Sequence, residues 1–264
     1  MSWMFVLYPF SPHMKSNRTE IVYDIYSFLY REPQHLGKMK NPESAYTTYD
    51  KAMTNMQKKE VSLNHLANIF FSFLPSDLLH QFFLQSVQKS LQADEYDLFV
   101  RSLDKVVQGI GDFTQPDIFF VGEQNTISLE MKIGAKSSLE QLMKYAFLHY
   151  KEQETSGVQK VHHLIYLGKW AFTSLREEKF DDVEALKNAF TTYQIPQKSK
   201  KWKISLGQYT QEIRSMVEQM NISYILYTDL KQFCLDNLPD QKANRQLYKL
   251  LQGMIEELEM RRLA

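Results

Sequence analysis

Cysteine is nearly absent from this chain, which contains only Cys234 among its 264 residues. A disulfide framework needs cysteines in pairs, and a cysteine-based zinc site needs several of them, so both are excluded. Because disulfides are rare in the cytoplasm, this composition leads us to expect a cytoplasmic protein.

Net charge is also lacking, since 31 basic residues balance 31 acidic ones. The balance excludes a global positive field of the histone kind, so any nucleic-acid site must rely on local positive charge. Long apolar runs are missing too, and none reaches the roughly 18 residues that a membrane-spanning helix needs. The apolar stretch Met1 to Phe10 is short, lacks a basic region and is broken by Pro9 and Pro12. We therefore expect neither a signal peptide nor a membrane partner.

The length allows one large domain, or one core that carries a helical elaboration. Apolar residues recur at helical spacing within residues 33–110, which favours packed helices over a cofactor site. We expect a helical N-terminal part over residues 1–110, with a first core helix at 17–31, followed by a core over residues 111–264. Within the N-terminal part, the predicted helices lie at 44–59, 62–74, 76–92 and 95–108.

The most informative stretch begins at Asp117, which opens the apolar run Ile118-Phe119-Phe120-Val121. Residues 123–125 have the composition of a turn, and residues 126–133 then alternate in character as a strand does. Side chains alternate between the faces of a strand, so Glu130 and Lys132 project from the same face. A hairpin would bring Asp117 close to both.

This grouping suits a metal site for phosphodiester hydrolysis. Mg²⁺ is a hard cation that takes oxygen ligands, often one or two carboxylates together with water and a substrate phosphate. Asp117 and Glu130 could supply those carboxylates. Lys132 could orient or deprotonate the attacking water, or offset charge on the phosphate.

A helix is predicted directly after this strand, from about Ser137 to Glu152. Ser137 or Ser138 can cap its first turn. Gln141 and Tyr145 are four residues apart and therefore lie on one helix face.

Pro116-Asp117, Glu130-Met131-Lys132 and Gln141…Tyr145 together resemble the motifs of the PD-(D/E)xK nuclease superfamily, in its RecB-like form. The resemblance implies an α/β, restriction-endonuclease-like core, in which a mixed central sheet is flanked by helices. Residues 111–264 would then form the nuclease core with its C-terminal helix.

The resemblance also implies a role for each motif residue. Asp117 and Glu130 would bind Mg²⁺ (or Mn²⁺), and the backbone carbonyl of Met131 would complete the coordination. Lys132 would help to activate water, while Gln141 and Tyr145 would place the DNA or the active site.

Members of this family often begin with a helix whose Thr-Glu pair joins the metal site, and Thr19-Glu20 is similar to that pair. Glu20 also sits three residues after Asn17, where a capping box alone accounts for it. Both interpretations of Glu20 stay open. Glu95 and Asp97 are rival candidates for the helix-borne acid.

Contacts to nucleic acid are expected from basic residues near the motif and from one basic loop. Lys136 and Lys144 could reach phosphates, although a solvated surface lysine is the better explanation for each of them alone. In the loop, Lys200 and Lys201 could neutralise phosphates, and Trp202 could stack on a base. The alternative is a solvated charged loop.

The rest of the sequence predicts strands at 161–167 and 222–227 and helices at 180–194, 206–220 and 241–262. His162 and His163 are adjacent in a strand and point to opposite faces, so they cannot hold one ion together. The long last helix could pack on the domain or pair with a second copy in a homodimer. The family usually has one more strand before the Pro-Asp strand, for which only residues 105–110 offer a candidate.

We therefore expect a Mg²⁺-dependent nuclease that acts on DNA. Two alternatives remain open: a catalytically idle nuclease-like module that binds nucleic acid or a protein partner, and a plain scaffold in which the motifs coincide by accident. The motifs do not distinguish internal cutting from cutting at ends.

Overall fold

The computed structural model describes residues 60–87, 91, 94–99, 116–133, 138–169, 180, 182–197 and 205–264. All of them fall in one compact unit, Gln57–Ala264. Several predictions lie outside the described residues: the helices at 17–31 and 44–59, the strand candidate at 105–110, and the site residues Glu20, Lys136, Lys200, Lys201 and Trp202.

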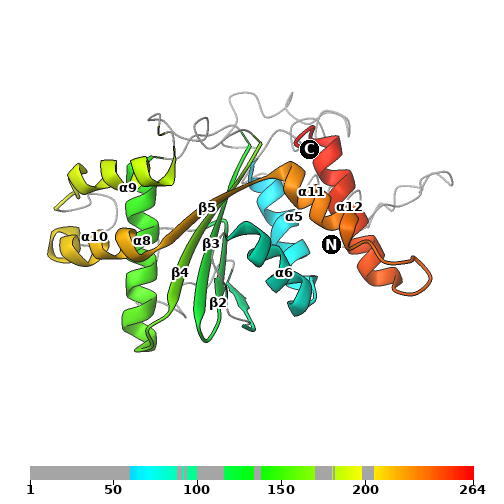
Figure 1. The fold of residues 1–264 in the computed structure, drawn as a ribbon, viewed down its shortest axis with the longest axis horizontal. Coiled ribbons are helices and arrows are strands. Elements are labelled where there is room, and N and C mark those ends of the chain that lie inside the picture. Colours follow the sequence, from blue (N-terminus) through cyan, green and yellow to red (C-terminus); the bar gives the residue numbers. More distant parts are fainter. Residues whose placement is uncertain are drawn as a thin grey trace, which may run out of the picture. The chain divides into compact units, whose positions relative to one another are not determined.

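A five-stranded mixed sheet forms the centre of the fold (Figure 1). In chain order, which is also the order in the sheet, its strands are β1 Asp97–Phe99, β2 Ile118–Val121, β3 Asn125–Lys132, β4 Val161–Gly168 and β5 Asn221–Leu226. The first three strands pair antiparallel, and β3, β4 and β5 pair parallel. The hairpin predicted around residues 123–125 forms, because β2 pairs with β3 across that turn.

Helices cover both faces of this sheet, as Figure 1 shows. One face packs against α5 Glu60–Phe73, α6 Ser76–Ser86, α11 Tyr227–Asp236 and α12 Arg245–Met260. The other face packs against α8 Leu139–Ser156, α9 Val183–Thr192, the short 3₁₀ helix η3 Leu206–Tyr209 and α10 Thr210–Gln219. The expected α/β class, with a mixed sheet flanked by helices, is therefore confirmed.

The alternation of β3 explains how two cores can share one sheet. Ile127, Leu129 and Met131 face the core of α5, α6, α11 and α12. The residues between them, Ser128 and Glu130, face α8. Because every residue of β3 is buried, the polar ones on the α8 side must find partners inside the protein.

One predicted helix is wrong in its described part. The sequence predicted a helix from residue 95 to 108, whereas Asp97–Phe99 is strand β1, paired with β2. A three-residue strand is too short to show an alternating pattern, and pairing with β2 overrides local helix propensity. Asp97 is exposed and pairs with Val121, at the opposite end of β2 from Asp117, so it is not the acid sought near the motif.

The last helix packs on the domain. Its buried apolar residues lie in the same core as α5, α6 and α11: Leu250, Leu251, Met254, Ile255 and Leu258. This was one of the two roles predicted for it, and pairing with a second copy stays a prediction. Among the described helices, none has both the length and the apolar character that crossing a bilayer requires.

Candidate active site

The β2–β3 hairpin places Asp117 beside the end of β3. Ile118 pairs with Leu129, so the residue before β2 continues the register opposite Glu130. The carboxylate of Asp117 accepts a hydrogen bond from the backbone N–H of Met131, with 2.8 Å between Oδ2 and N. Asp117 is therefore tied to the centre of the Glu-x-Lys sequence and remains half-buried.

The Glu130 carboxylate is the point where the other motif residues meet. The Lys132 ammonium lies 2.5 Å from its Oε1. The Gln141 side-chain amide donates to the same oxygen, and the Tyr145 hydroxyl donates to Oε2. Glu130 is 3% exposed and Lys132 6% exposed, so this charge pair satisfies the rule that buried charges are paired.

Tyr145 acts as a hydrogen-bond donor in this arrangement. It is 1% exposed. Burial raises its pKa well above the ordinary value, and the charges of Glu130 and Asp117 and the hydrogen bond to Glu130 raise it further. The phenol therefore keeps its proton at neutral pH and donates it in the hydrogen bond to Glu130.

Helix α8 sets the position of Gln141 and Tyr145. Ser138 caps its start by accepting a hydrogen bond from the backbone N–H of Gln141 at 3.3 Å. Gly157, with φ of 66°, ends the helix in the left-handed conformation that glycine tolerates best. Because Gln141 and Tyr145 are four residues apart, both can donate to the carboxylate of Glu130.

Two further residues contact Asp117, and the sequence did not indicate them. The side-chain amide of Asn64, on α5, donates to Asp117 Oδ1. Asn68, one turn later, donates to the backbone oxygens of Asp117 at 3.1 Å and Asn64 at 2.8 Å. The available signal was a pair of asparagines at i, i+4 within an otherwise apolar helix.

Lys144 has a different surrounding. Its ammonium lies 2.8 Å from Glu140 Oε1, one turn earlier on α8, and its side chain is partly exposed. It is not among the contacts of Glu130 given above. Phosphate binding by Lys144 therefore stays a prediction, and only its place at the surface of α8 supports it.

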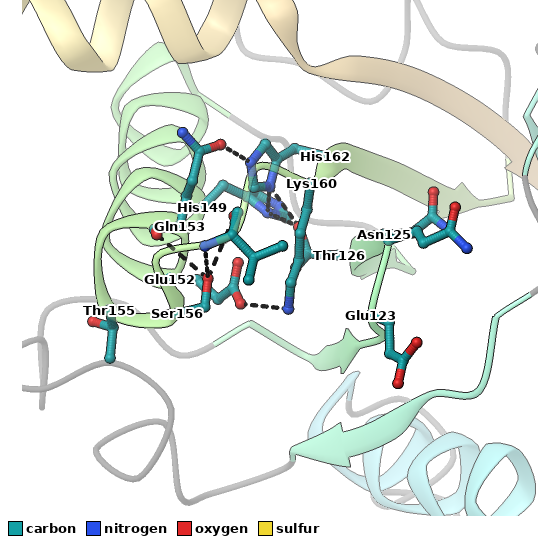
Figure 2. Close-up of polar contacts among 12 residues, drawn as sticks. Glu123, Asn125, Thr126, His149, Glu152, Gln153, Thr155, Ser156, Lys160 and His162 are labelled. Atoms are coloured by element: carbon teal, nitrogen blue, oxygen red, sulfur yellow. Dashed lines mark hydrogen bonds and ion pairs between the residues drawn. The ribbon is translucent and has the colours of Figure 1, made fainter.

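Gln141 and Tyr145 begin a row of polar residues along α8, which continues into a second buried cluster (Figure 2). His149 and Gln153 follow Tyr145 at intervals of four residues. His149 Nδ1 lies 2.9 Å from Thr126 Oγ1, and His149 Nε2 lies 3.0 Å from Ser128 Oγ. His162, on β4, lies 2.6 Å from Thr126 Oγ1 through Nδ1 and 2.9 Å from Gln153 Oε1 through Nε2.

With both rings neutral, these contacts assign the hydrogens to particular ring nitrogens. Gln153 Oε1 can only accept, so His162 Nε2 donates and its Nδ1 accepts from the Thr126 hydroxyl. Thr126 then accepts from His149 Nδ1, and His149 Nε2 accepts from the Ser128 hydroxyl. The chain is complete with both rings neutral.

Burial lowers the pKa of both histidines, which favours their neutral form. It lowers the pKa of His149 well below the usual value, and the neighbouring His162 and His163 lower it further. It lowers the pKa of His162 to about 4, with smaller contributions from His163 and Lys160. Lys160 itself lies 2.9 Å from Glu152 Oε1 in a buried ion pair beside the cluster (Figure 2).

The donor atoms near Asp117 have the chemistry that Mg²⁺ or Mn²⁺ prefers. The carboxylates of Asp117 and Glu130 are hard oxygen donors, as are the amide oxygens of Asn64 and Asn68. Both amide oxygens are buried and have no hydrogen-bond partner among the described residues. No group of three or more His, Cys, Asp or Glu within those residues is arranged to hold a metal. The third predicted acid, Glu20, lies outside them.

Comparisons of the chain with protein-family models, with curated proteins and with solved structures gave no match.

Proposed function

We propose that this protein is a Mg²⁺-dependent nuclease of the PD-(D/E)xK kind, which hydrolyses phosphodiester bonds of DNA. The observation that carries the proposal is the convergence of Lys132, Gln141 and Tyr145 on the Glu130 carboxylate, with Asp117 anchored beside it. These residues come from a hairpin and the following helix, so their meeting depends on tertiary structure. Accidental matches to the motifs would have no reason to converge.

The contacts and the resemblance together support a role for each residue. Asp117 and Glu130, with the carbonyl of Met131, would hold the cation, which when bound polarises the phosphate and lowers the pKa of a water molecule. Gln141 and Tyr145 fix the rotamer of Glu130 by donating to both of its oxygens. The Lys132 ammonium has three N–H donors, so it can contact Glu130 and still donate to a phosphate oxygen or to water.

DNA is proposed as the substrate because the resemblance implies it, and because positive charge is supplied locally in a chain without net charge. Lys144 lies at the surface of the same helix as Gln141 and Tyr145. Lys136 and the loop with Lys200, Lys201 and Trp202 remain proposed contacts.

The test is incubation of the full chain with linear, circular and single-stranded DNA, with and without Mg²⁺. We expect cleavage only with the metal, and degradation of circles would identify internal cutting. Asp117→Ala and Lys132→Ala should each slow cleavage on the order of 100-fold to 1,000-fold, because each removes a group that stabilises transition-state charge.

Lys231→Ala is the matched control, since this lysine pairs with Glu259 at the surface of α11. Circular dichroism confirms that each variant is folded. Undiminished cutting by Asp117→Ala or Lys132→Ala refutes the proposal.

One observation favours a second candidate, a catalytically idle module that binds nucleic acid or a protein. Both oxygens of Glu130 already have protein donors, and Lys132 neutralises its charge as a cation would. Calorimetry separates the candidates: uptake of Mg²⁺ or Mn²⁺ favours the nuclease, and its absence favours the idle module.

A further inference from the structure

Helix α5 contributes two asparagines to the surroundings of Asp117. Asn64 donates to the carboxylate itself, at Oδ1. Met131 donates to Oδ2, so both carboxylate oxygens accept from protein donors.

Asn68 holds Asp117 and Asn64 together. Its side-chain nitrogen donates to the backbone oxygens of Asp117 and Asn64, at 3.1 and 2.8 Å. One amide thus joins the start of β2 to the helix turn that carries Asn64. The position of the Asp117 carboxylate follows from both asparagines, because one fixes its backbone and the other its side chain.

The contacts described so far leave the side-chain oxygens of Asn64 and Asn68 without a role. Both are buried and lack a hydrogen-bond partner among the described residues, and Asn68 as a whole is 7% exposed. A buried amide oxygen without a donor destabilises the folded protein. Two such atoms, on side chains that donate to Asp117, indicate that a donor or a cation from outside the protein completes them.

We propose that Asn64 and Asn68 belong to the metal site: their nitrogens hold the Asp117 carboxylate, and their oxygens accept hydrogen bonds from water around the cation. This inference rests on the proposed function. It adds α5 to the hairpin and α8 as a third element of the site. It also explains why amides stand at these positions, since an apolar side chain would provide neither the donors nor the acceptors.

The experiment measures Mn²⁺ binding to the full chain by calorimetry, together with the midpoint of thermal unfolding. Asn64→Leu and Asn68→Leu keep approximate size and remove the amide. We expect each to weaken Mn²⁺ binding about 10-fold to 100-fold, as loss of a group that orients a metal ligand does. Should Asn64→Leu not fold, Asn64→Ser serves in its place with the same expectation.

The matched control is Asn237→Leu. Asn237, which caps the C-terminus of α11, makes the same kind of bond, from its side-chain nitrogen to Phe233 O at 2.9 Å. It should alter thermal unfolding only and leave Mn²⁺ affinity unchanged. A purely structural role for Asn64 predicts the same pattern for Asn64→Leu.

The outcomes separate the two claims. If Asp117→Ala loses Mn²⁺ binding but the asparagine variants keep wild-type affinity, this inference is overturned and the proposed function stands. If the wild-type chain takes up no Mn²⁺ and cuts no DNA, the proposed function fails and the inference fails with it. Weakened binding in the asparagine variants, with the Asn237 variant unchanged, supports the inference.

Discussion

Glu130 shows how a single residue can decide the chemistry of a buried site. Its carboxylate has lost nearly all contact with solvent and depends on Lys132, Gln141 and Tyr145 for compensation. Such compensation is sensitive to the removal of one partner, because the carboxylate stays buried when the partner is gone. The strongest consequences of mutation are therefore expected at the donors.

Tyr145→Phe tests this dependence with the smallest possible change. It removes one hydroxyl and leaves Glu130 Oε2 without that donor, so the free energy of unfolding should fall by about 1 to 3 kcal/mol. Urea denaturation measures the difference. Tyr150→Phe is the control, since its hydroxyl makes only a long, exposed contact with Glu154 at 3.4 Å and its loss should change little. Equal stability of the Tyr145 variant and the wild type would contradict the assigned hydrogen bond.

Residues of this site differed in how far the sequence could predict them. Asp117, Glu130 and Lys132 were predicted together from strand alternation and the hairpin, and Gln141 and Tyr145 were predicted to join them through the resemblance to the nuclease motifs. Asn64 and Asn68 were not, because they reach Asp117 from a helix some fifty positions earlier in the sequence. Nothing in local spacing determines which helix packs at that edge of the sheet.

At the scale of elements, the contact between α8 and the sheet is polar along much of its length. A polar residue recurs every four positions along α8. Gln141 and Tyr145 contact Glu130. His149 contacts Ser128 and Thr126, and Gln153 contacts His162. Apolar residues of α8 pack on both sides of this row. The row therefore sets the register of α8 on the sheet, and with it the position of Gln141 and Tyr145 at Glu130.

The histidines of this row make the stability depend on pH. The pKa of His162 is about 4 in the folded protein and near 6.5 when the ring is solvated, so the unfolded chain takes up the proton first as pH falls. Stability is complete above pH 6.5 and declines toward pH 4, by about 1.4 kcal/mol per pH unit for each such histidine. His149 acts in the same direction, while Lys160 and His163 oppose protonation of His162.

Urea denaturation at pH 7 and pH 5 measures this decline. His162→Gln removes one of the two groups, so its stability should fall less between the two pH values than that of the wild type. An equal decline in both proteins would contradict the neutral, hydrogen-bonded state assigned to His162.

The helices and strands could be predicted where their sequence pattern was long enough. The helices α5, α6, α8, α9, α10 and α12 and the strands β2 to β5 have periodic or apolar patterns long enough to recognise. Strand β1 does not, and residues 97–99 were assigned to a helix. The link between His149 and His162 was also missed, because the parallel pairing of β3 and β4 that aligns Thr126 with His162 is a tertiary contact.

At the scale of the whole described unit, the sheet separates two cores, and the candidate site draws on both sides. Asn64 approaches from the helices of one face, while Gln141 and Tyr145 approach from the other. A site built this way forms only when both layers are packed on the sheet. We therefore expect metal binding and global folding to be coupled.

The central claim is that Asp117 and Lys132 act as parts of one catalytic unit. Rates of Mg²⁺-dependent DNA cleavage for the wild type, Asp117→Ala, Lys132→Ala and the double variant test it most directly. Residues of one catalytic unit are strongly non-additive, so the double variant should be no slower than the more damaged single variant. Losses that multiply in the double variant, or a single variant that cuts like the wild type, would contradict the claim.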